Sequence, residues 1–222
     1  MKLYHGSKVE ILNPIPHGSN KDNDYGPAFY TTRDLESAHE WACKNGVVGY
    51  VNEYEFNIKN LKVLDLSDKS KYSVLNWVAI LLHYRSLPNS FIKACRTRLD
   101  YLEEHYYIDV NEYDVVIGFR ADDAYFRFPL DFVRGNLTLD QLEYSYQLGT
   151  LGIQYVLISE KAFKYLQYIK AIKSEYKYIN NYFETVKKAT NDFDALDKDS
   201  DGIRIIDIIR GNIKWSTYQM II

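Results

Sequence analysis

Residues 26–32, in the N-terminal half of the chain, read Gly-Pro-Ala-Phe-Tyr-Thr-Thr. Aromatic and β-branched residues dominate it after the Gly-Pro pair, which predicts a strand over 28–32. A helix is expected directly afterwards, because Asp34 is a good N-cap and apolar residues follow at helical spacing up to Gly46. The stretch therefore predicts a strand that leads into a helix, with Trp41 of that helix anchored in the core.

A short alternating strand is expected upstream, over residues 2–5, and Gly6-Ser7 breaks it at once. Proline, glycine, asparagine and aspartate are so dense over residues 13–25 that neither helix nor strand is expected there. Connections of this length in a compact domain are often functional. The N-terminal region is therefore expected to hold two strands separated by a loop that is a candidate for function.

Hydrophobic periodicity and capping signals predict the elements of the remaining chain. Strands are expected over 48–58 and 62–66, which form a hairpin around Asn60, and helices over 72–84 and 91–106, with a break at Pro88-Asn89. A strand over 113–118 follows, and then a helix that begins with a capping box at Thr138 and Gln141 and ends at Gly149. The last elements are a strand over 153–158 and one long amphipathic helix from 160 to about 189. Strands with interspersed helices but without regular βαβ alternation favour a mixed α+β sheet over a doubly wound parallel sheet.

The length of 222 residues favours one large domain with an appendage, since a typical domain has about 150 residues. We expect a domain over residues 1–160, with a helical insert at about 68–107, and a helical C-terminal extension over 161–222. Hydrophobic residues at 46% and charged residues at 26% are typical of a folded globular protein.

Composition also excludes several classes of protein. No apolar run approaches the ~20 residues of a membrane span, and the N-terminus lacks the apolar stretch of a secretory signal, so we expect a cytoplasmic protein. A net charge of −3 differs from the strongly basic balance of a DNA-coating protein. The two cysteines, Cys43 and Cys95, are too few and too far apart for a disulfide framework or a cysteine zinc site.

The common catalytic fingerprints G-x-S-x-G, G-x-x-x-x-G-K and G-x-G-x-x-G are absent from the sequence. What remains is Tyr4-His5-Gly6-Ser7 at the first strand, the Gly-Pro-x-Phe-Tyr-Thr-Thr stretch after the first loop, and a helix containing Ala38-x-x-Trp41-Ala42. This combination resembles the opening of ADP-ribosyltransferases of the diphtheria-toxin and poly(ADP-ribose) polymerase class, and it is most similar to an uncharacterised bacterial branch of that superfamily. The resemblance covers residues 1–160 and is strongest at the N-terminal end.

The resemblance implies an α+β fold, with an ADP-ribosyltransferase-like mixed sheet, the helical insert and a long C-terminal helix, and it implies NAD as the substrate. In that superfamily the site is built from a histidine on the first strand, a tyrosine on the second and a glutamate on a later strand. His5 and Tyr30 match the first two places, and Gln154 stands where the glutamate is expected. The residues that the resemblance places against NAD are His5, Gly6, Ser7, Tyr30, Thr31 and Thr32.

The chemistry of NAD cleavage gives these residues physical roles. Breaking the nicotinamide–ribose bond passes through an oxocarbenium-like state, so the site must hold the nicotinamide, fix the ribose hydroxyls and favour positive charge. His5 is expected to hydrogen-bond a ribose hydroxyl, Gly6 to let the backbone approach the carboxamide, and the face of Tyr30 to stack on the nicotinamide ring. Gln154 can orient the ribose, but it supplies no negative charge.

Two acidic segments are further candidates. Asp122 and Asp123 follow a predicted strand and could supply the missing charge or contact the acceptor, with a solvated turn as the alternative. Residues 197–202 copy the first half of a calcium loop, but Arg204 and Ile208 stand at later loop positions that require other residue types. We therefore expect an acidic turn there and no metal cofactor.

The function expected from these observations is NAD-dependent ADP-ribosyl transfer to a macromolecular acceptor, protein or nucleic acid. One expected setting is the toxin of a toxin–antitoxin pair, with an antitoxin as partner. Lysines interleaved with tyrosines over 160–190 fit a nucleic-acid acceptor, although such a run is usually a solvated face. Two alternatives stay open: a binding module that senses NAD without turnover, because Gln154 lacks a carboxylate, and an NAD glycohydrolase, in which water is the acceptor.

Overall fold

The computed structural model describes residues 1–121, 125–145, 152–197 and 201–211. Its strands are β1 (Lys2–Ser7), β2 (Phe29–Thr32), β3 (Tyr50–Phe56), β4 (Val63–Asp65), β5 (Val115–Phe119), β6 (Ile153–Leu157) and β7 (Leu166–Lys173). Its helices are α1 (Leu35–Cys43), α2 (Val74–Tyr84), α3 (Asn89–Tyr106), α4 (Arg127–Arg134), α5 (Leu139–Ser145), α6 (Glu160–Phe163), α7 (Lys177–Asp194) and α8 (Ile205–Ile209), with a short 3-10 turn at Val110–Glu112.

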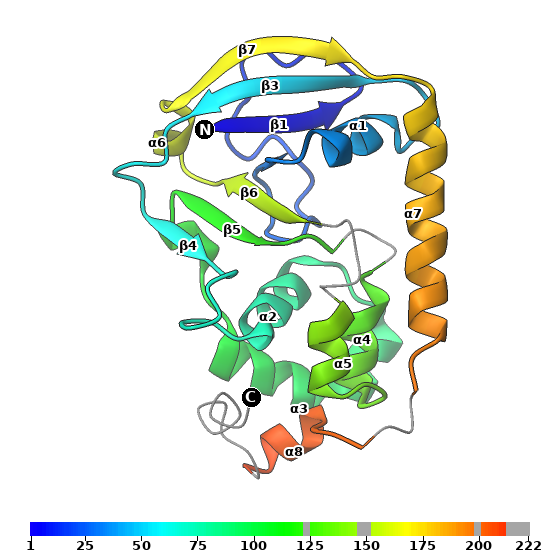
Figure 1. The fold of residues 1–222 in the computed structure, drawn as a ribbon. Coiled ribbons are helices and arrows are strands. Elements are labelled where there is room, and N and C mark those ends of the chain that lie inside the picture. Colours follow the sequence, from blue (N-terminus) through cyan, green and yellow to red (C-terminus); the bar gives the residue numbers. More distant parts are fainter. Residues whose placement is uncertain (122–124, 146–151, 198–200, 212–222) are drawn as a thin grey trace.

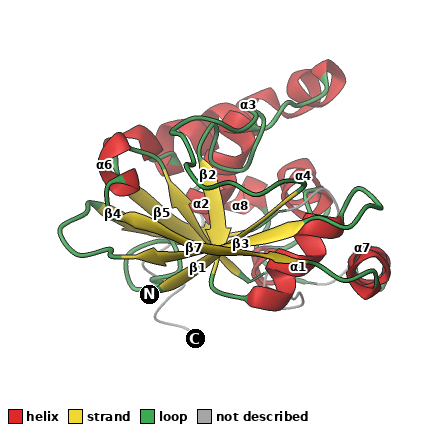
Figure 2. Cartoon of the chain, turned by 90° about the horizontal axis from the view of Figure 1, so that it is seen from above, coloured by secondary structure: helices red, strands yellow, loops and turns green. Residues whose placement is uncertain are grey.

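The strands form one seven-stranded mixed sheet in the order β4-β5-β6-β2-β1-β3-β7 (Figure 1). Each neighbouring pair is antiparallel except β4 and β5, which run parallel. This arrangement confirms the predicted α+β class with a mixed sheet and excludes a doubly wound parallel sheet. The strands fan out when the sheet is seen from above, as strand twist requires (Figure 2).

The two central strands, β1 and β2, share very little backbone pairing. β1 pairs with β3 along its whole length, and β2 pairs in the same way with β6. Between β1 and β2, Tyr4 and Thr32 form the single pair of the register within the described residues. One backbone pair near the middle of the molecule therefore joins the β1-β3-β7 half of the sheet to the β2-β6-β5-β4 half (Figure 1).

The predicted helical insert covers one face of the sheet. Trp77 and Ile80 of α2 are completely buried and belong to the same apolar cluster as Val116 of β5 and Val156 of β6. The break between the two helices of the insert falls at Pro88, as predicted. α4, α5 and α8 lie on the same side of the sheet, with α8 below α3 and farther from the strands (Figure 1). Within the described ranges, no helix is long and apolar enough to cross a membrane.

Helix α1 lies directly on β1 because Gly6 has no side chain. A Cβ atom at Gly6 would lie 2.2 Å from the carbonyl oxygen of Ala38 and 2.7 Å from the amide nitrogen of Ala42. Asp34 caps the helix as predicted, since its Oδ1 accepts a hydrogen bond from the Glu36 amide at 3.0 Å. The predicted strand-to-helix unit is confirmed, and its helix is held against the first strand.

The predicted hairpin between the strands over 48–58 and 62–66 is wrong. The chain does turn at Asn60, which has a φ of 64°. However, both sides of β3 are occupied, by β1 and by β7, and β4 lies at the far edge of the sheet beside β5. β4 has only 3 residues, whereas β7 has 8 to pair with β3. The longer strand β7 therefore pairs with β3 in place of β4, and the turn at Asn60 gives no sign of this choice.

The predicted helix from 160 to about 189 is wrong in its first half. A short α6 is followed by β7, and α7 begins only at Lys177. In β7, Leu166 and Tyr168 pack on the small cluster around Phe29. These two buried residues are two positions apart, which is the period of a strand and not of a helix. The free edge of β3 offers backbone partners along this segment, and that pairing outweighs the helical pattern. The extension over 161–222, predicted as helical, thus contributes a strand to the sheet.

Gly6→Ala should lower the free energy of unfolding by about 1–3 kcal/mol, because the new methyl group would displace the backbone of α1. Urea denaturation of the two proteins measures this difference. Lys8→Ala, on the exposed neighbouring position, is the control and should change stability by less than about 0.5 kcal/mol. A Gly6→Ala protein as stable as the parent would contradict the close contact between α1 and β1.

Candidate functional site

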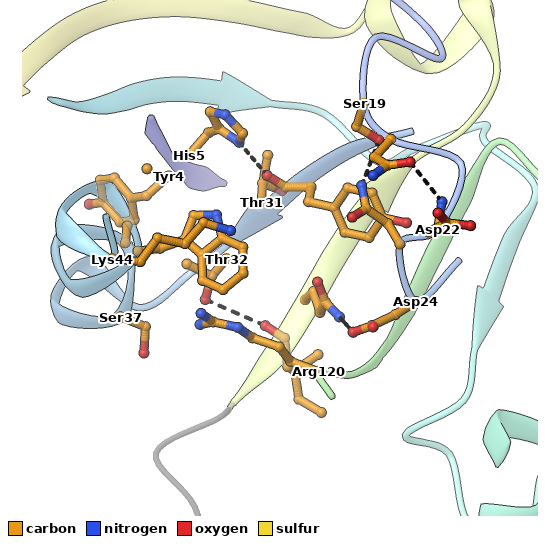
Figure 3. Close-up of a pocket in the computed structure, with 18 of the residues that line it drawn as sticks. Tyr4, His5, Ser19, Asp22, Asp24, Thr31, Thr32, Ser37, Lys44 and Arg120 are labelled. Atoms are coloured by element: carbon orange, nitrogen blue, oxygen red, sulfur yellow. Dashed lines mark hydrogen bonds between the residues drawn. The ribbon is translucent and has the colours of Figure 1, made fainter. Parts of the chain in front are cut away.

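A cavity of about 660 Å³ lies where β1, β2, β6, α1 and the loop before β2 meet (Figure 3). The residues that line it include Tyr4, His5, Gly6, Ser19, Asp22, Asp24, Tyr30, Thr31, Thr32, Ser37, Trp41, Lys44, Arg85, Arg120 and Gln154. Among the described residues, Tyr4 and Thr32 are the single register pair between β1 and β2. The cavity therefore forms where the strand pairing between the two halves of the sheet is shortest.

His5 lies on β1, and a hydrogen bond and a stacking contact hold its ring. Its Nδ1 is 2.6 Å from the carbonyl oxygen of Tyr30, and its ring stacks on Phe29 with centroids 4.5 Å apart. A carbonyl oxygen only accepts, so Nδ1 carries the proton and Nε2 of the neutral ring is an acceptor. Burial, together with the charge of Lys44, lowers the pKa of His5. The ring is therefore neutral at pH 7 and can accept a hydrogen bond through Nε2.

Tyr30 lies on β2 and uses its hydroxyl group within the protein. The hydroxyl donates to the carbonyl oxygen of Gly26 at 2.6 Å and accepts from the backbone amide of Tyr25 at 3.0 Å. Burial raises the pKa of the phenol well above its usual value, so the hydroxyl keeps its proton. The sequence predicted a role for the ring face alone. The structure adds a second role, because the hydroxyl holds the turn that follows the first loop.

Gln154 is buried on β6, opposite Thr32 of β2. Its Nε2 donates to the carbonyl oxygen of Phe119 at 3.2 Å and to Oδ2 of Asp24 at 3.1 Å. A carbonyl oxygen cannot donate, and this fixes which way the amide faces. In the part of the chain that the structure describes, Oε1 has no hydrogen-bond partner. The amide therefore remains able to accept a hydrogen bond from a ligand.

Asp24 is a candidate functional residue that the sequence reasoning missed. Its side chain is buried and lines the cavity beside Gln154. Its Oδ2 also accepts from the backbone amide of Ala121 at 2.8 Å, and its Oδ1 lies 3.6 Å from Nη1 of Arg85. Burial raises the pKa of Asp24 to about 6, against the lowering effect of these partners. A loop thus places a buried carboxylate next to the amide that stands in the expected glutamate position.

The sequence carried only a general signal for Asp24. It lies in the loop over 13–25, which has the length of a functional loop, but it is one of several turn-forming residues there. Its contact with Gln154 spans 130 positions of the chain. No local pattern distinguishes it from the other polar residues of that loop.

Trp41 lies at the cavity and not in the core, contrary to the prediction. Lys44 Nζ is 3.6 Å and Arg120 Cζ is 4.2 Å from the centroid of its ring, as expected for cation–π contacts. The helix buries a neighbouring face through Ala38 and Ala42, which explains why a large apolar residue at this spacing was assigned to the core. One wall of the cavity therefore combines an aromatic ring with two cationic side chains.

Gly6, Thr31 and Thr32 line the cavity, as the resemblance implied. The hydroxyl of Thr31 donates to the carbonyl oxygen of Tyr155 at 2.6 Å, and that of Thr32 donates to the carbonyl oxygen of Ile153 at 3.4 Å. These two side chains therefore fasten β2 to β6. The missing side chain of Gly6 has a structural use as well, since α1 occupies the space.

Ser7 is not among the residues that line the cavity. The hydroxyl of Ser7 accepts from Nδ2 of Asn52 at 3.0 Å and donates to the carbonyl oxygen of Val9, so it faces the start of the first loop. Asp122 and Asp123 lie outside the described residues, as do positions 198–200 of the acidic segment. Among the residues that the structure does describe, no group of three or more His, Cys, Asp or Glu side chains is placed to hold a metal ion.

Residues 1–168 match a family model described as "Protein of unknown function (DUF3990)". The match contains all the cavity residues named above, and it ends within β7. Neither the search of curated proteins nor the search of solved structures gave a match.

The raised pKa of Asp24 predicts that the stability it contributes decreases as the pH rises. Its pKa in the folded protein is about 6 against a usual value of 3.8, so the folded protein binds this proton more tightly than the unfolded chain does. The stabilisation is complete below about pH 4, is lost as the pH rises through about 6, and amounts to at most about 3 kcal/mol. Urea unfolding from about pH 4 to 7.5 measures it as the difference between the parent and Asp24→Asn, which lacks this titration. A constant difference would contradict a buried, weakly acidic Asp24.

Proposed function

The chain belongs to the DUF3990 family, whose function is unknown, and we propose that it is an NAD-dependent ADP-ribosyltransferase acting on a macromolecular acceptor. The observation that carries the proposal is the convergence of His5, Tyr30 and Gln154, from three strands, on one cavity. The same order of positions along the chain is used by the ADP-ribosyltransferases that the sequence resembles. Sheet register, and not closeness in sequence, brings the three side chains together.

The charges in the cavity suit NAD. The nicotinamide ring of NAD is positively charged, and its diphosphate is negatively charged. Lys44 and Arg120 flank the ring of Trp41, and Lys44 and Asp24 lie on opposite sides of the cavity in Figure 3. The cavity volume of about 660 Å³ lies within the range of roughly 300–1,000 Å³ for small-molecule sites. The cavity thus offers opposite charges to the two charged parts of one ligand.

His5 is prepared to position the ribose. Its neutral ring has an acceptor at Nε2, which matches the hydrogen of a ribose hydroxyl. The hydrogen bond from Nδ1 to Tyr30 fixes the ring in advance, so little reorganisation is needed when the ligand binds. Tyr30 lines the same cavity, and the face of its ring would stack on the nicotinamide.

The proposed reaction breaks the bond between the nicotinamide nitrogen and C1 of the ribose. Nicotinamide leaves with the bonding electron pair, which neutralises its ring, and positive charge develops on C1. An oxygen or nitrogen of the acceptor then donates an electron pair to C1 and releases its proton to solvent. Groups that fix the ribose and favour positive charge in the transition state lower the barrier to this transfer.

Incubation of the purified protein with labelled NAD and a whole-cell extract should release nicotinamide and transfer the label to a macromolecule. Digestion of the product with protease or nuclease identifies the class of acceptor. Nicotinamide release in buffer alone would indicate NAD hydrolysis, and NAD binding in calorimetry without release would indicate a binding module; either would replace the transferase proposal. Absence of both binding and release would exclude all three functions.

His5→Ala should reduce nicotinamide release at least about 100-fold without unfolding the protein, because the ribose loses its fixed acceptor. His83→Ala is the matched control, since His83 is exposed on α2 and its partner is Glu103. Single-turnover rates and melting temperatures of both variants check the prediction. Equal rates for the two variants, or a melting temperature many degrees lower for His5→Ala, would contradict the positioning role.

A further inference from the structure

Resting on the NAD chemistry proposed above, we infer that the carboxylate of Asp24 supplies the negative charge that stabilises the ribosyl cation. Gln154 holds this carboxylate through Nε2 and presents Oε1 to the ribose. Two residues from separate segments then share the work that one glutamate at position 154 would do. The family match assigns no role to either residue.

The two carboxylate oxygens of Asp24 have different surroundings. Oδ2 is held by two donors, the backbone amide of Ala121 at 2.8 Å and Nε2 of Gln154 at 3.1 Å. Oδ1 lies 3.6 Å from Nη1 of Arg85, which is too long for a direct hydrogen bond. Within the described residues, Oδ1 accepts no hydrogen bond. Oδ2 therefore fixes the carboxylate, whereas Oδ1 is ion-paired with Arg85 but has no direct hydrogen bond, and we assign Oδ1 to the substrate.

The loop that carries Asp24 is itself held in place. The Tyr30 hydroxyl binds the backbone of the next two residues, Tyr25 and Gly26, at 3.0 and 2.6 Å. The hydroxyl of Tyr25 donates to the carbonyl oxygen of Phe119 at 2.8 Å, the same oxygen that receives Gln154 Nε2. Because Asp24 and Gln154 are tied to the same frame, their separation is preorganised, as a charge-stabilising site requires.

The groups around Asp24 make its charge depend on pH near neutrality. Burial favours the protonated form of Asp24. The hydrogen bonds from the Ala121 amide and from Gln154 and the charges of Arg85 and Arg120 favour the ionised form, and Tyr30 is neutral. The resulting pKa of about 6 leaves the carboxylate largely ionised above pH 7. The rate of nicotinamide release should therefore fall as the pH decreases through about 6.

Asp24 forms no covalent bond in this scheme. Nicotinamide leaves with the electron pair of the broken bond, and the cation that remains on the ribose is balanced electrostatically by the carboxylate. Capture of C1 by the acceptor electron pair removes that cation, and the acceptor proton passes to solvent. The carboxylate is then unchanged and ready for the next molecule of NAD.

Three variants of the full chain test the inference in single-turnover release of nicotinamide. Asp24→Asn should slow release about 100-fold or more, with NAD affinity by calorimetry changed only a few-fold. Gln154→Glu should also slow release, because the new carboxylate would face Oδ2 of Asp24 and the carbonyl oxygen of Phe119. The double variant exchanges amide and carboxylate, so the repulsion between positions 24 and 154 is removed while that from the Phe119 carbonyl stays, and it should be at least about tenfold faster than either single variant. Asp100→Asn, on the exposed face of α3, is the matched control.

A faster double variant separates a charge-supplying role of Asp24 from a merely structural one. If Asp24 only fastened the loop, a carboxylate at position 154 could not restore the rate. A double variant no faster than the single variants, or an Asp24→Asn protein with the parent rate, would overturn the inference alone. If Asp24→Asn does not fold, two measurements test the inference: the rate of the double variant against that of Gln154→Glu, and the parent rate below about pH 6. A double variant no faster than Gln154→Glu, together with a parent rate that does not fall below about pH 6, overturns the inference. A parent protein that releases no nicotinamide would overturn the proposed function and this inference with it.

Discussion

Within the part of the chain that the structure describes, three side chains donate hydrogen bonds to the carbonyl oxygen of Phe119, at the end of β5. Tyr25 Oη lies at 2.8 Å, Trp77 Nε1 at 2.9 Å and Gln154 Nε2 at 3.2 Å. The three donors come from the loop before β2, from the helical insert and from β6, and all three side chains are buried. A buried donor left without a partner costs about 1–3 kcal/mol, so each segment is bound to this oxygen. The loop, the insert and strand β6 are thus held by one hydrogen-bond acceptor beside the cavity.

Gly118 makes this junction possible. A Cβ atom there would lie 2.1 Å from Oη of Tyr25, so any side chain would push Tyr25 away from the Phe119 carbonyl. Gly118 also lies opposite Gln154 in the pairing of β5 with β6. The restriction at this sheet position therefore comes from the docking of a distant loop and not from the conformation of the strand. Because Asp24 precedes Tyr25 directly, the same glycine controls where the carboxylate is held.

Interactions between near neighbours could be predicted from the sequence, and interactions between distant segments could not. The cap at Asp34 and the capping box that begins at Thr138 each involve residues within three positions, and both are present. The pairing of β7 with β3 depends on an edge that no local pattern reveals, so residues 166–173 were assigned to a helix. The residues of the candidate site show the same difference between local and long-range signals. Gln154 was found through a family pattern, whereas Asp24 reaches it from a loop whose composition indicated only turns.

Strand β7 has a consequence for the boundaries of the folded unit. It covers the outer side of β3, and its Lys170 lies 3.7 Å from the buried carboxylate of Glu53. A fragment ending at residue 160, where the sequence placed the end of the domain, would leave β3 with a long row of unpaired backbone groups. Such an edge recruits strands from other chains and promotes aggregation. In the intact chain, the exposed lysines at 170 and 173 place charge on the new outer edge, which discourages the same self-association.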